Sequence, residues 1–403
     1  MSKILLKNAA VFDACHWNEK LDVLVDGQRI EKVQPSIQPS EAGTVYDLSG
    51  YSLLPGIIDA HVHLISGING DDVYTDVHLK NWAKAGVCLV RDLGLGGKRP
   101  LSDYITWRNG VRLDPQCCDV VSAGKYITAV GGRSHIMPDG AQTGIGCSTP
   151  GDVVAAIDLQ LDSGCDGVKA MFGTRNGAGR LLPNLGPNEV KAMVNHAAER
   201  GVWVCCHVLE TEFLPMLLDA GMPELAHIPT DNVIDDETVE RLVAQNVAVT
   251  PTLIANTEAP PPMTSGKMPP ELMELMKKMP PPDRSLQKQQ DANAVENLHR
   301  FFVKGGMVAL GTDTMRMDTK PRPVGIPTGE MRQLIRAGLG LRDVIAAATI
   351  HAARVCRMDG ELGSITEGKR ACIIAIRSPL DETFSALDHA EFVMNRGVVL
   401  KHE

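Results

Sequence analysis

Two histidines, His61 and His63, stand one residue apart at the end of an apolar run. In a β-strand, side chains at positions i and i+2 point to the same face. The two imidazoles are therefore expected to lie side by side, as a divalent metal ion such as zinc requires. The chain has 12 histidines, so one such pair is weak evidence until other ligands accompany it.

Four further residues with ligand chemistry close later apolar runs of the chain: Lys169, His207, His227 and Asp313. Imidazole and carboxylate groups suit zinc and similar divalent ions. Lys169 does not fit this set, because its ammonium group repels a cation. It either binds a substrate anion, forms a Schiff base, or has reacted with carbon dioxide to give a carbamate. A carbamate is a bidentate anion that could bridge two metal ions.

The elements that position these residues follow a repeating strand–helix pattern, with helix patterns at residues 187–200 and 236–245. Eight such units over about 250 residues predict a (β/α)8 TIM barrel, and a doubly wound sheet is the alternative. The barrel is favoured because every candidate ligand falls at the C-terminal end of a strand, where barrel enzymes place their chemistry. The expected strands end near His63, Asp92, Gly124, Lys169, His207, His227, Thr250 and Asp313.

Both ends of the chain are rich in short strand patterns and too small to form separate cores. Residues 1–54 and 359–403 therefore predict one composite β-sandwich, and residues 55–358 predict the barrel domain. The strand–helix pattern is interrupted from residue 251 to about 292, where three proline clusters follow the seventh expected strand. This segment is either a solvated surface excursion or a lid over the catalytic face.

The ordered ligand set resembles that of the amidohydrolase superfamily of metal-dependent hydrolases, over nearly the full chain. Lys169 resembles the bridging lysine of its two-metal branch. The run at residues 54–59 is common in the superfamily. Residues 90–94 and 348–353 resemble a subgroup with imidazolonepropionase-like hydrolases and metal-dependent dipeptidases. The chain departs from this subgroup after His207, where dipeptidases usually carry a tyrosine.

The resemblance implies how the ligands divide between two divalent ions, which are expected to be zinc. Lys169 would be N-carboxylated by CO2 and would span both ions. His207 and His227 would hold one of them. The other would be held by His61, His63 and Asp313. Six ligand-type residues also exceed what one tetrahedral zinc needs.

The implied reaction is hydrolysis of an amide or cyclic amide C–N bond by a metal-bridging hydroxide. Asp313 would act as general base and then as general acid. His135, in the loop after the third strand, is a candidate for a substrate or oxyanion contact, and a surface loop histidine is the alternative.

Other activities stay open. Glu210, three residues after His207, resembles the proton shuttle of single-metal deaminases, although that branch lacks the bridging lysine. It is otherwise an acidic residue near a helix N-terminus. The same site could cleave C–O bonds as a lactonase or esterase. A non-enzymatic scaffold would have lost ligands, and none is lost in this sequence.

Three cationic residues fall in the loops after the third and fourth strands: Lys125, Arg133 and Arg175. These loops rim the catalytic mouth of a barrel. Arginine can grip a carboxylate through two parallel hydrogen bonds. A small substrate with a carboxylate near the scissile bond is therefore predicted, and ordinary surface charges are the alternative.

Composition narrows the remaining choices. A hydrophobic content of 44% suits a globular enzyme, and no apolar run is long enough to span a membrane. The net charge of −9 does not indicate nucleic-acid binding, which needs an excess of positive charge to contact phosphates. The N-terminus lacks a signal-peptide pattern and the cysteine spacing is not that of a zinc ribbon, which predicts a cytoplasmic enzyme with reduced cysteines. The expected partner is a small-molecule substrate, and a homo-oligomer is left open.

Overall fold

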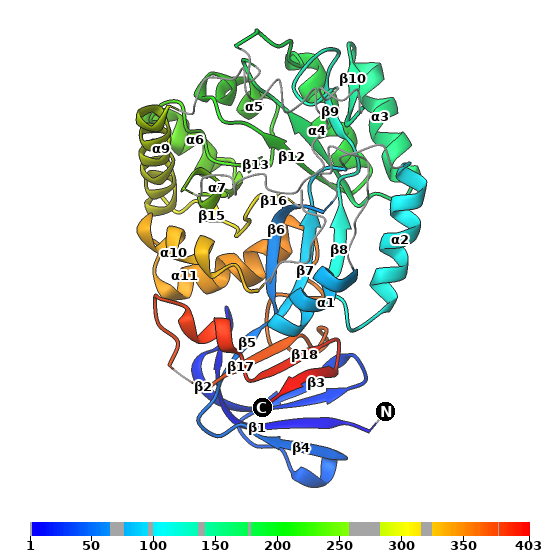
Figure 1. Ribbon diagram of the computed structural model, residues 1–403, viewed down its shortest axis with the longest axis vertical. Helices are drawn as coiled ribbons and strands as arrows, with labels where there is room; N and C mark the ends of the chain where they lie inside the picture. The colour runs from blue at the N-terminus through cyan, green and yellow to red at the C-terminus, as the bar shows by residue number, and fades with distance from the viewer. Residues whose placement is uncertain are drawn as a thin grey trace, which may run out of the picture.

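A computed structural model of the chain describes residues 2–64, 76–95, 100–135, 142–175, 179–257, 283–315, 325–377 and 379–403. Its strands and helices form a barrel above a smaller sheet domain that contains both chain termini (Figure 1). No helix in these ranges is both long enough and apolar enough to cross a membrane.

Parallel strands line the barrel, and their hydrogen bonds close it on both sides. Ala60 N–H donates to Leu310 O at 2.9 Å, and Asp166 N–H donates to Ser122 O at 2.9 Å. These contacts join the seven-stranded and four-stranded parallel sheets into which the strands group. The barrel prediction is thus confirmed. Its strands are β6 (Ile57–His63), β7 (Val87–Asp92), β8 (Asp119–Ser122), β11 (Gly167–Met171), β12 (Trp203–His207), β13 (Glu224–Ala226), β14 (Ala248–Thr250) and β15 (Met307–Val308).

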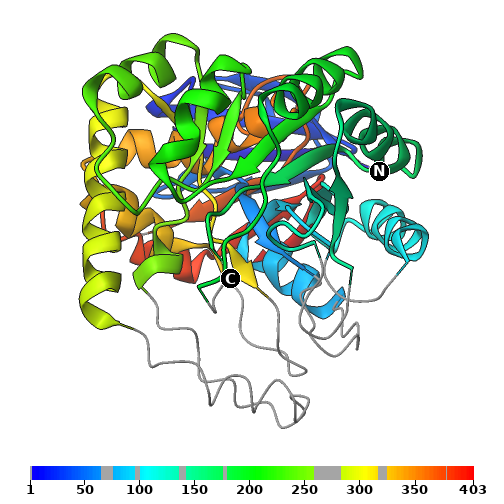
Figure 2. The same cartoon turned by 90° about the horizontal axis from the view of Figure 1, so that it is seen from above.

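Helices surround these strands, as the view from above shows (Figure 2). Some begin at clear caps: the Thr149 side chain accepts the Asp152 N–H, and Asp235 accepts the Thr238 N–H. Covered on both faces, the strands are buried along almost their full length. The helices are α1 (Asp76–Ala85), α2 (Leu101–Leu113), α3 (Pro150–Asp162), α4 (Pro187–Glu199), α5 (Leu214–Asp219), α6 (Asp236–Ala244), α7 (Ile254–Thr257), α9 (Arg284–Val303), α10 (Thr328–Arg336), α11 (Leu341–Ala346) and α12 (Ala352–Val355).

Three short strands extend this plan near the mouth. β9 (Tyr126–Ala129) and β10 (Gly144–Cys147) pair in parallel after β8, and β16 (Thr314–Met315) pairs with β6. The predicted excursion at 251–292 ends earlier than expected, because α9 already begins at Arg284. Most of the segment that could form a lid, residues 258–282, lies outside the described residues.

The two ends of the chain build one eight-stranded sheet. β5 pairs with β17, which brings the N-terminal and C-terminal strands together. The sheet folds back on itself, because Ile30 N–H donates to Lys369 O and Ala371 N–H donates to Gln28 O. An apolar cluster fills the space between its layers, so the composite sandwich is confirmed. Its strands are β1 (Ile4–Phe12), β2 (Trp17–Asp26), β3 (Arg29–Gln34), β4 (Thr44–Asp47), β5 (Ser52–Pro55), β17 (Ile373–Ile376), β18 (Phe392–Asn395) and β19 (Val398–His402).

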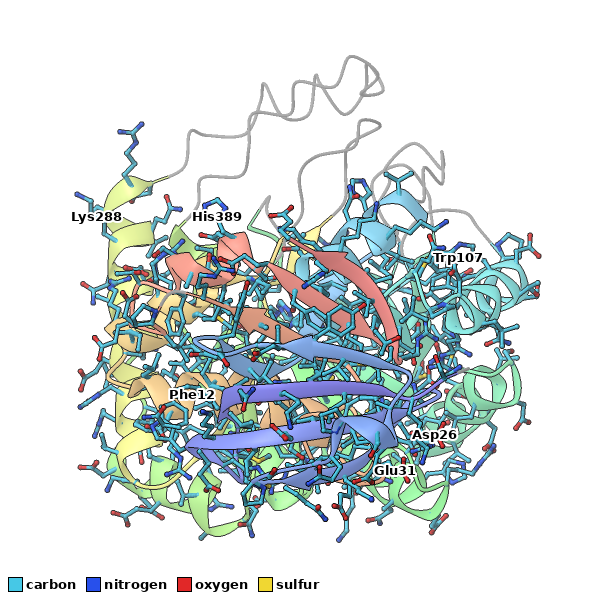
Figure 3. All side chains as sticks on the ribbon, turned by 90° about the horizontal axis from the view of Figure 1, so that it is seen from below. Phe12, Asp26, Glu31, Trp107, Lys288 and His389 are labelled. Carbon is cyan, nitrogen blue, oxygen red and sulfur yellow. The ribbon has the colours of Figure 1, made fainter. Side chains whose placement is uncertain are left out.

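Seen from below, this sheet lies across the molecule, with Phe12 and Asp26 labelled toward opposite ends of its strands (Figure 3).

A buried ion pair crosses the barrel interior. The fully buried Arg91 of β7 donates to both carboxylate oxygens of Glu224 of β13, one of them at 2.8 Å. Arg91 also donates to Ala60 O at 2.7 Å, and the Thr250 hydroxyl donates to Glu224 at 2.8 Å. The pair thus ties four barrel strands together below the ligand candidates.

Replacement of Glu224 by alanine is expected to lower the free energy of unfolding by about 3–5 kcal/mol, because Arg91 would stay buried without its counter-charge. Urea unfolding measures this loss. Asp219→Ala is the matched control, since it removes the exposed carboxylate that pairs with Arg241 and should change little. Equally small losses in both variants would contradict the assigned role.

Candidate metal centre

The predicted ligands all lie at the C-terminal ends of barrel strands. His61 and His63 belong to β6, Lys169 to β11 and His207 to β12. His227 directly follows β13, and Asp313 lies between β15 and β16. Five of the six side chains are buried, and the Asp313 side chain is 22% exposed. The residues are thus held by the barrel itself, and the fold leaves only the aspartate open to the mouth.

Four of these side chains are in direct contact. His63 Nε2 lies 3.1 Å from Asp313 Oδ1, and His61 Nε2 lies 3.3 Å from the same oxygen. Lys169 Nζ lies 3.0 Å from His61 Nε2. Ligand atoms of His61, His63 and Asp313 all fall within 4.8 Å of one another, a spacing that suits a shared ion.

The remaining two histidines adjoin this group. The ring centroids of His61 and His227 are 4.7 Å apart, and those of His207 and His227 are 4.4 Å apart. All six predicted residues therefore form one cluster.

The backbone is strained where two of the candidates sit. His227 has φ of 129° and Asp313 has φ of 55°, both in the region that non-glycine residues rarely adopt. Asp59 holds the segment before Asp313, accepting the Thr312 N–H at 3.1 Å and the Thr312 hydroxyl at 2.7 Å. Such strain persists only where surrounding contacts impose it, and it is common at functional sites.

Burial lowers the pKa values of His61, His207 and His227 and so favours their neutral form, which is the form that binds metal ions. Burial and the charge of Lys169 hold the pKa of His61 well below its usual value, and burial lowers the pKa of His227 to about 3. Burial alone would raise the pKa of Asp313, but its hydrogen bond with His63 and the nearby charges lower it to about 2. The site therefore presents neutral imidazoles beside an ionised carboxylate.

The donor set fits divalent ions. His207 Nε2 is buried without a hydrogen-bond partner among the described residues, so it is free to donate its lone pair. Neutral imidazole nitrogens and a carboxylate oxygen are the groups that zinc prefers. Lys169, buried in the middle of them, has no carboxylate partner in the described ranges.

Two residues that the sequence pattern did not predict hold the outer nitrogens of the histidines. The Tyr126 hydroxyl lies 3.3 Å from His63 Nδ1, and Thr252 Oγ1 lies 2.7 Å from His227 Nδ1. Contacts of this kind orient metal-binding imidazoles. Both residues follow a barrel strand within a few positions, and that position is the signal that could have found them.

Of the three predicted substrate cations, Arg133 is the one that the structure brings to the cluster. Its side chain packs on Gly173, two residues after β11, where a Cβ would meet Arg133 Cδ at 2.8 Å. Burial is the main cause that lowers the pKa of His207, followed by the charge of His227 and then by the charge of Arg133. Arg133 has no hydrogen bond or ion pair within the described part of the chain.

The other substrate candidates lie differently. Arg175 is exposed and donates to Gly179 O at 2.7 Å. Lys125 is half-buried in the loop before β9, and no described contact joins it to the cluster. His135 accepts the Gly131 N–H at Nδ1 and packs over Gly146 of β10, so its contacts stabilise its own loop.

Glu210 lies on the loop after β12. Its Oε1 accepts the Thr174 N–H at 3.3 Å, and its Oε2 is buried without a partner among the described residues. It therefore faces the same Gly173–Thr174 segment against which Arg133 packs.

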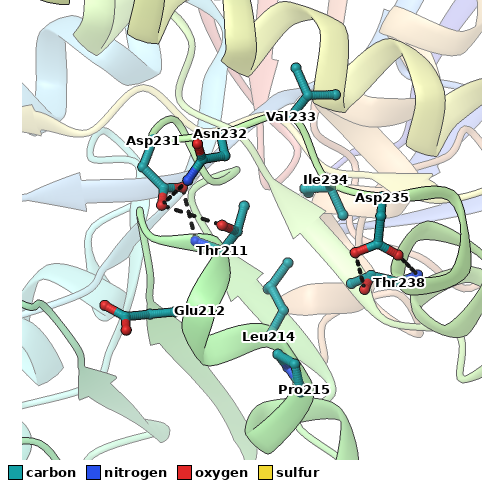
Figure 4. Close-up of a pocket in the computed structure, with 10 residues that line it drawn as sticks. All are labelled: Thr211, Glu212, Leu214, Pro215, Asp231, Asn232, Val233, Ile234, Asp235 and Thr238. Atoms are coloured by element: carbon teal, nitrogen blue, oxygen red, sulfur yellow. Dashed lines mark hydrogen bonds between the residues drawn. The ribbon is translucent and has the colours of Figure 1, made fainter.

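A separate pocket of about 400 Å³ lies between the loops after β12 and β13 (Figure 4). Thr211 and Asp231 bridge these loops by hydrogen bonds. None of the six ligand candidates lines this pocket, so it is not the metal centre.

Comparisons with known proteins agree with this architecture. A Xaa-Pro dipeptidase structure with bound methionine has a TM-score of 0.76 at 21% identity and covers 99% of this chain and 100% of that one. The ochratoxinase of A. niger has a TM-score of 0.77 at 18% identity, over 100% of this chain and 96% of that one. At such identities these structures show a shared fold.

Curated relatives align over a short segment. A dihydroorotase of Pediococcus pentosaceus is 46% identical over 61 residues, which are 15% of this chain and 14% of that protein. A dihydroorotase of Syntrophotalea carbinolica is 44% identical over 63 residues, 15% of each chain. The matched segment thus spans only a small part of these relatives.

The family evidence is broader. The family model described as "Amidohydrolase family" matches residues 144–401, more than half of the chain. This range includes four of the six clustered residues, and the sequence resemblance supplies the same family for the histidine pair before it. The chain therefore belongs to the amidohydrolase family.

Proposed function

We propose that this amidohydrolase cleaves an amide or cyclic amide C–N bond at a centre that holds two divalent ions, expected to be zinc. The observation that carries the proposal is Lys169, which is 1% exposed and lies 3.0 Å from His61 Nε2 inside the histidine cluster. A buried ammonium is costly when no carboxylate lies within ion-pair distance of it, and Lys169 has none among the described residues. Beside two bound cations it would be costlier still.

N-carboxylation of Lys169 removes this conflict. The neutral amine attacks CO2, a C–N bond forms, and loss of a proton leaves a carbamate anion. Burial lowers the pKa of Lys169, which favours the neutral amine that reacts. The carbamate would provide oxygen ligands for both ions. His207 and His227 would complete one ion's set, and the other set would comprise His61, His63 and Asp313.

The divalent ions, when bound, supply a nucleophile from water near neutral pH and polarise the substrate carbonyl. The partly exposed carboxylate of Asp313 beside His61 and His63 supports a role in proton transfer. We assign it the role of taking the proton of the attacking water and giving it to the leaving nitrogen.

For the substrate we propose a small molecule with a carboxylate near the scissile bond, such as an N-acyl amino acid, a dipeptide-like amide or a carboxylated lactam. Arg133 supports this choice, since its guanidinium has no partner in the described residues and its charge acts on His207. The glycine at position 173 leaves the room that its side chain occupies. A planar guanidinium there could bind a carboxylate through two hydrogen bonds.

Replacement of Arg133 by alanine is expected to raise KM for a carboxylated amide about 10-fold or more, with a smaller effect on its methyl ester, because a charge-assisted hydrogen bond is lost. Steady-state kinetics on the acid and ester pair measures the difference. Lys125→Ala and Arg175→Ala are the matched controls. If the ester is cleaved equally well by wild type, or if the three variants behave alike, Arg133 does not bind a carboxylate.

Deamination is the alternative to amide hydrolysis that one structural observation, the position of Glu210, supports. Glu210 has one buried carboxylate oxygen without a described partner and lies three residues after His207. A panel of amides, lactones and amino-substituted heterocycles, with ammonia and acid release measured in parallel, separates the reactions. Amide cleavage without ammonia from the heterocycles is expected. Ammonia release alone would establish the deaminase, and preferred lactone cleavage would establish the esterase.

A further inference from the structure

The loop after β14 connects the cluster to helix α10. Thr252 stands two residues past the strand, is 1% exposed, and has φ of 53°. A β-branched residue in this left-handed region is strained. Surrounding contacts must therefore impose the conformation, and they are found on a helix that is distant in sequence.

Glu330 of α10 provides those contacts. It is 1% exposed, and its two carboxylate oxygens accept the next two backbone N–H groups of the loop, Leu253 at 2.9 Å and Ile254 at 2.7 Å. Gly329 also packs closely here, because a Cβ at this position would meet Ile254 Cδ1 at 3.3 Å. The carboxylate thus clamps the loop directly after Thr252.

The clamped loop presents one group to the cluster, the Thr252 hydroxyl, 2.7 Å from His227 Nδ1. A neutral imidazole can bind a metal ion through Nε2 only when its proton is on Nδ1. The hydroxyl oxygen is then the acceptor of that proton's hydrogen bond. His227 itself has a strained backbone, with φ of 129°, so its ring direction depends on such support.

We infer that Glu330 and Thr252 are positioning residues, which fix His227 in the tautomer and orientation that turn Nε2 toward the metal centre. The inference rests on the proposed function only in assigning His227 to an ion. Glu330 acts through the backbone of the loop, and Thr252 acts through its hydroxyl. Neither residue touches the substrate.

The test titrates the metal-free full chain with Zn²⁺ in bicarbonate buffer and measures both dissociation constants. Thr252→Val, which keeps the branched shape but loses the hydroxyl, should weaken one of the two sites about 10–100-fold. Thr252→Ser, which keeps the hydroxyl, should stay within a few-fold of wild type. Thr349→Val is the matched control, because it removes another buried hydroxyl, bonded to Ile345 O, away from the cluster.

Glu330→Gln leaves one loop N–H without its acceptor and should weaken the same site. Because both residues act through one loop, the double variant Thr252→Val with Glu330→Gln should be no weaker than the poorer single variant. If Glu330→Gln does not fold, the comparison of Thr252→Val with Thr252→Ser still tests the inference. Equal zinc affinities for Thr252→Val and wild type, or equal losses for Thr252→Val and Thr252→Ser, would overturn the inference.

A second measurement separates this inference from the proposed function. Nitrogen NMR of the metal-free protein reports the tautomer of His227 without any ion. We expect the Nδ1-protonated form in wild type and Thr252→Ser, and a mixed population in Thr252→Val. Wild type that binds fewer than two ions would contradict the two-metal proposal. An unchanged His227 tautomer in Thr252→Val would contradict only the role of Thr252.

Discussion

Replacement of Lys169 by alanine is expected to abolish tight binding of two ions and to lower kcat/KM by a factor on the order of 10³ or more. The variant loses the carbamate that would supply oxygen ligands to both ions at once. The four histidines remain, so one ion is expected to bind weakly. Metal analysis after dialysis and kinetics on the same preparation measure both effects.

Short carboxylates provide the rescue test for this variant. Acetate or formate can enter the space of the missing side chain and offer two oxygens to the ions. Partial recovery of metal content and turnover with added carboxylate is expected, and chloride at equal ionic strength should give none. Lys125→Ala is the matched control and should behave like wild type. A Lys169→Ala protein that keeps both ions and its turnover would refute the bridging role.

Asp313→Asn is expected to keep most of the bound metal and to lose about 10²–10⁴-fold in kcat, because an amide oxygen can still bind an ion but cannot take a proton. The side chain lies between His61 and His63, within 3.3 Å of both Nε2 atoms. Metal content and kcat are measured on one preparation.

Asp231→Asn is the control for this variant, since Asp231 is an acid on a loop of the same barrel face and bonds to Thr211. It should leave kcat nearly unchanged. A near-normal kcat for Asp313→Asn would show that Asp313 is a metal ligand and has no part in proton transfer.

Much of the barrel and the cluster could be predicted from the sequence, because strand ends in such a barrel all face the same way. His61 and His63 are two positions apart on one strand, and His207 ends another. Apolar runs locate these strands, and their C-terminal ends meet at one mouth whatever the lengths of the helices between them.

Contacts made through folded loops could not be predicted in this way. Thr252 meets His227 across 25 residues, and Glu330 meets Ile254 across 76. Neither spacing has a local period. The β9–β10 pair could not be predicted either, because its strands have only four residues each and β10 contains two glycines.

The three substrate cations show the same limit. Lys125, Arg133 and Arg175 look equivalent in sequence, since each follows a barrel strand. The packing of Arg133 on Gly173 distinguishes it from the others, and that packing depends on how the loop after β8 folds over the end of β11. Likewise His135 packs on Gly146, a contact that its position in the chain does not indicate.

The central claim is a centre of two ions bridged by a carboxylated Lys169, and one measurement tests it most directly. The protein is prepared with zinc and ¹³C-bicarbonate, its metal content is determined, and its carbon NMR spectrum is recorded. Two zinc ions per chain and a carbamate signal that is absent from Lys169→Ala are predicted. One ion per chain with an unmodified lysine would contradict the account and favour the single-metal deaminase.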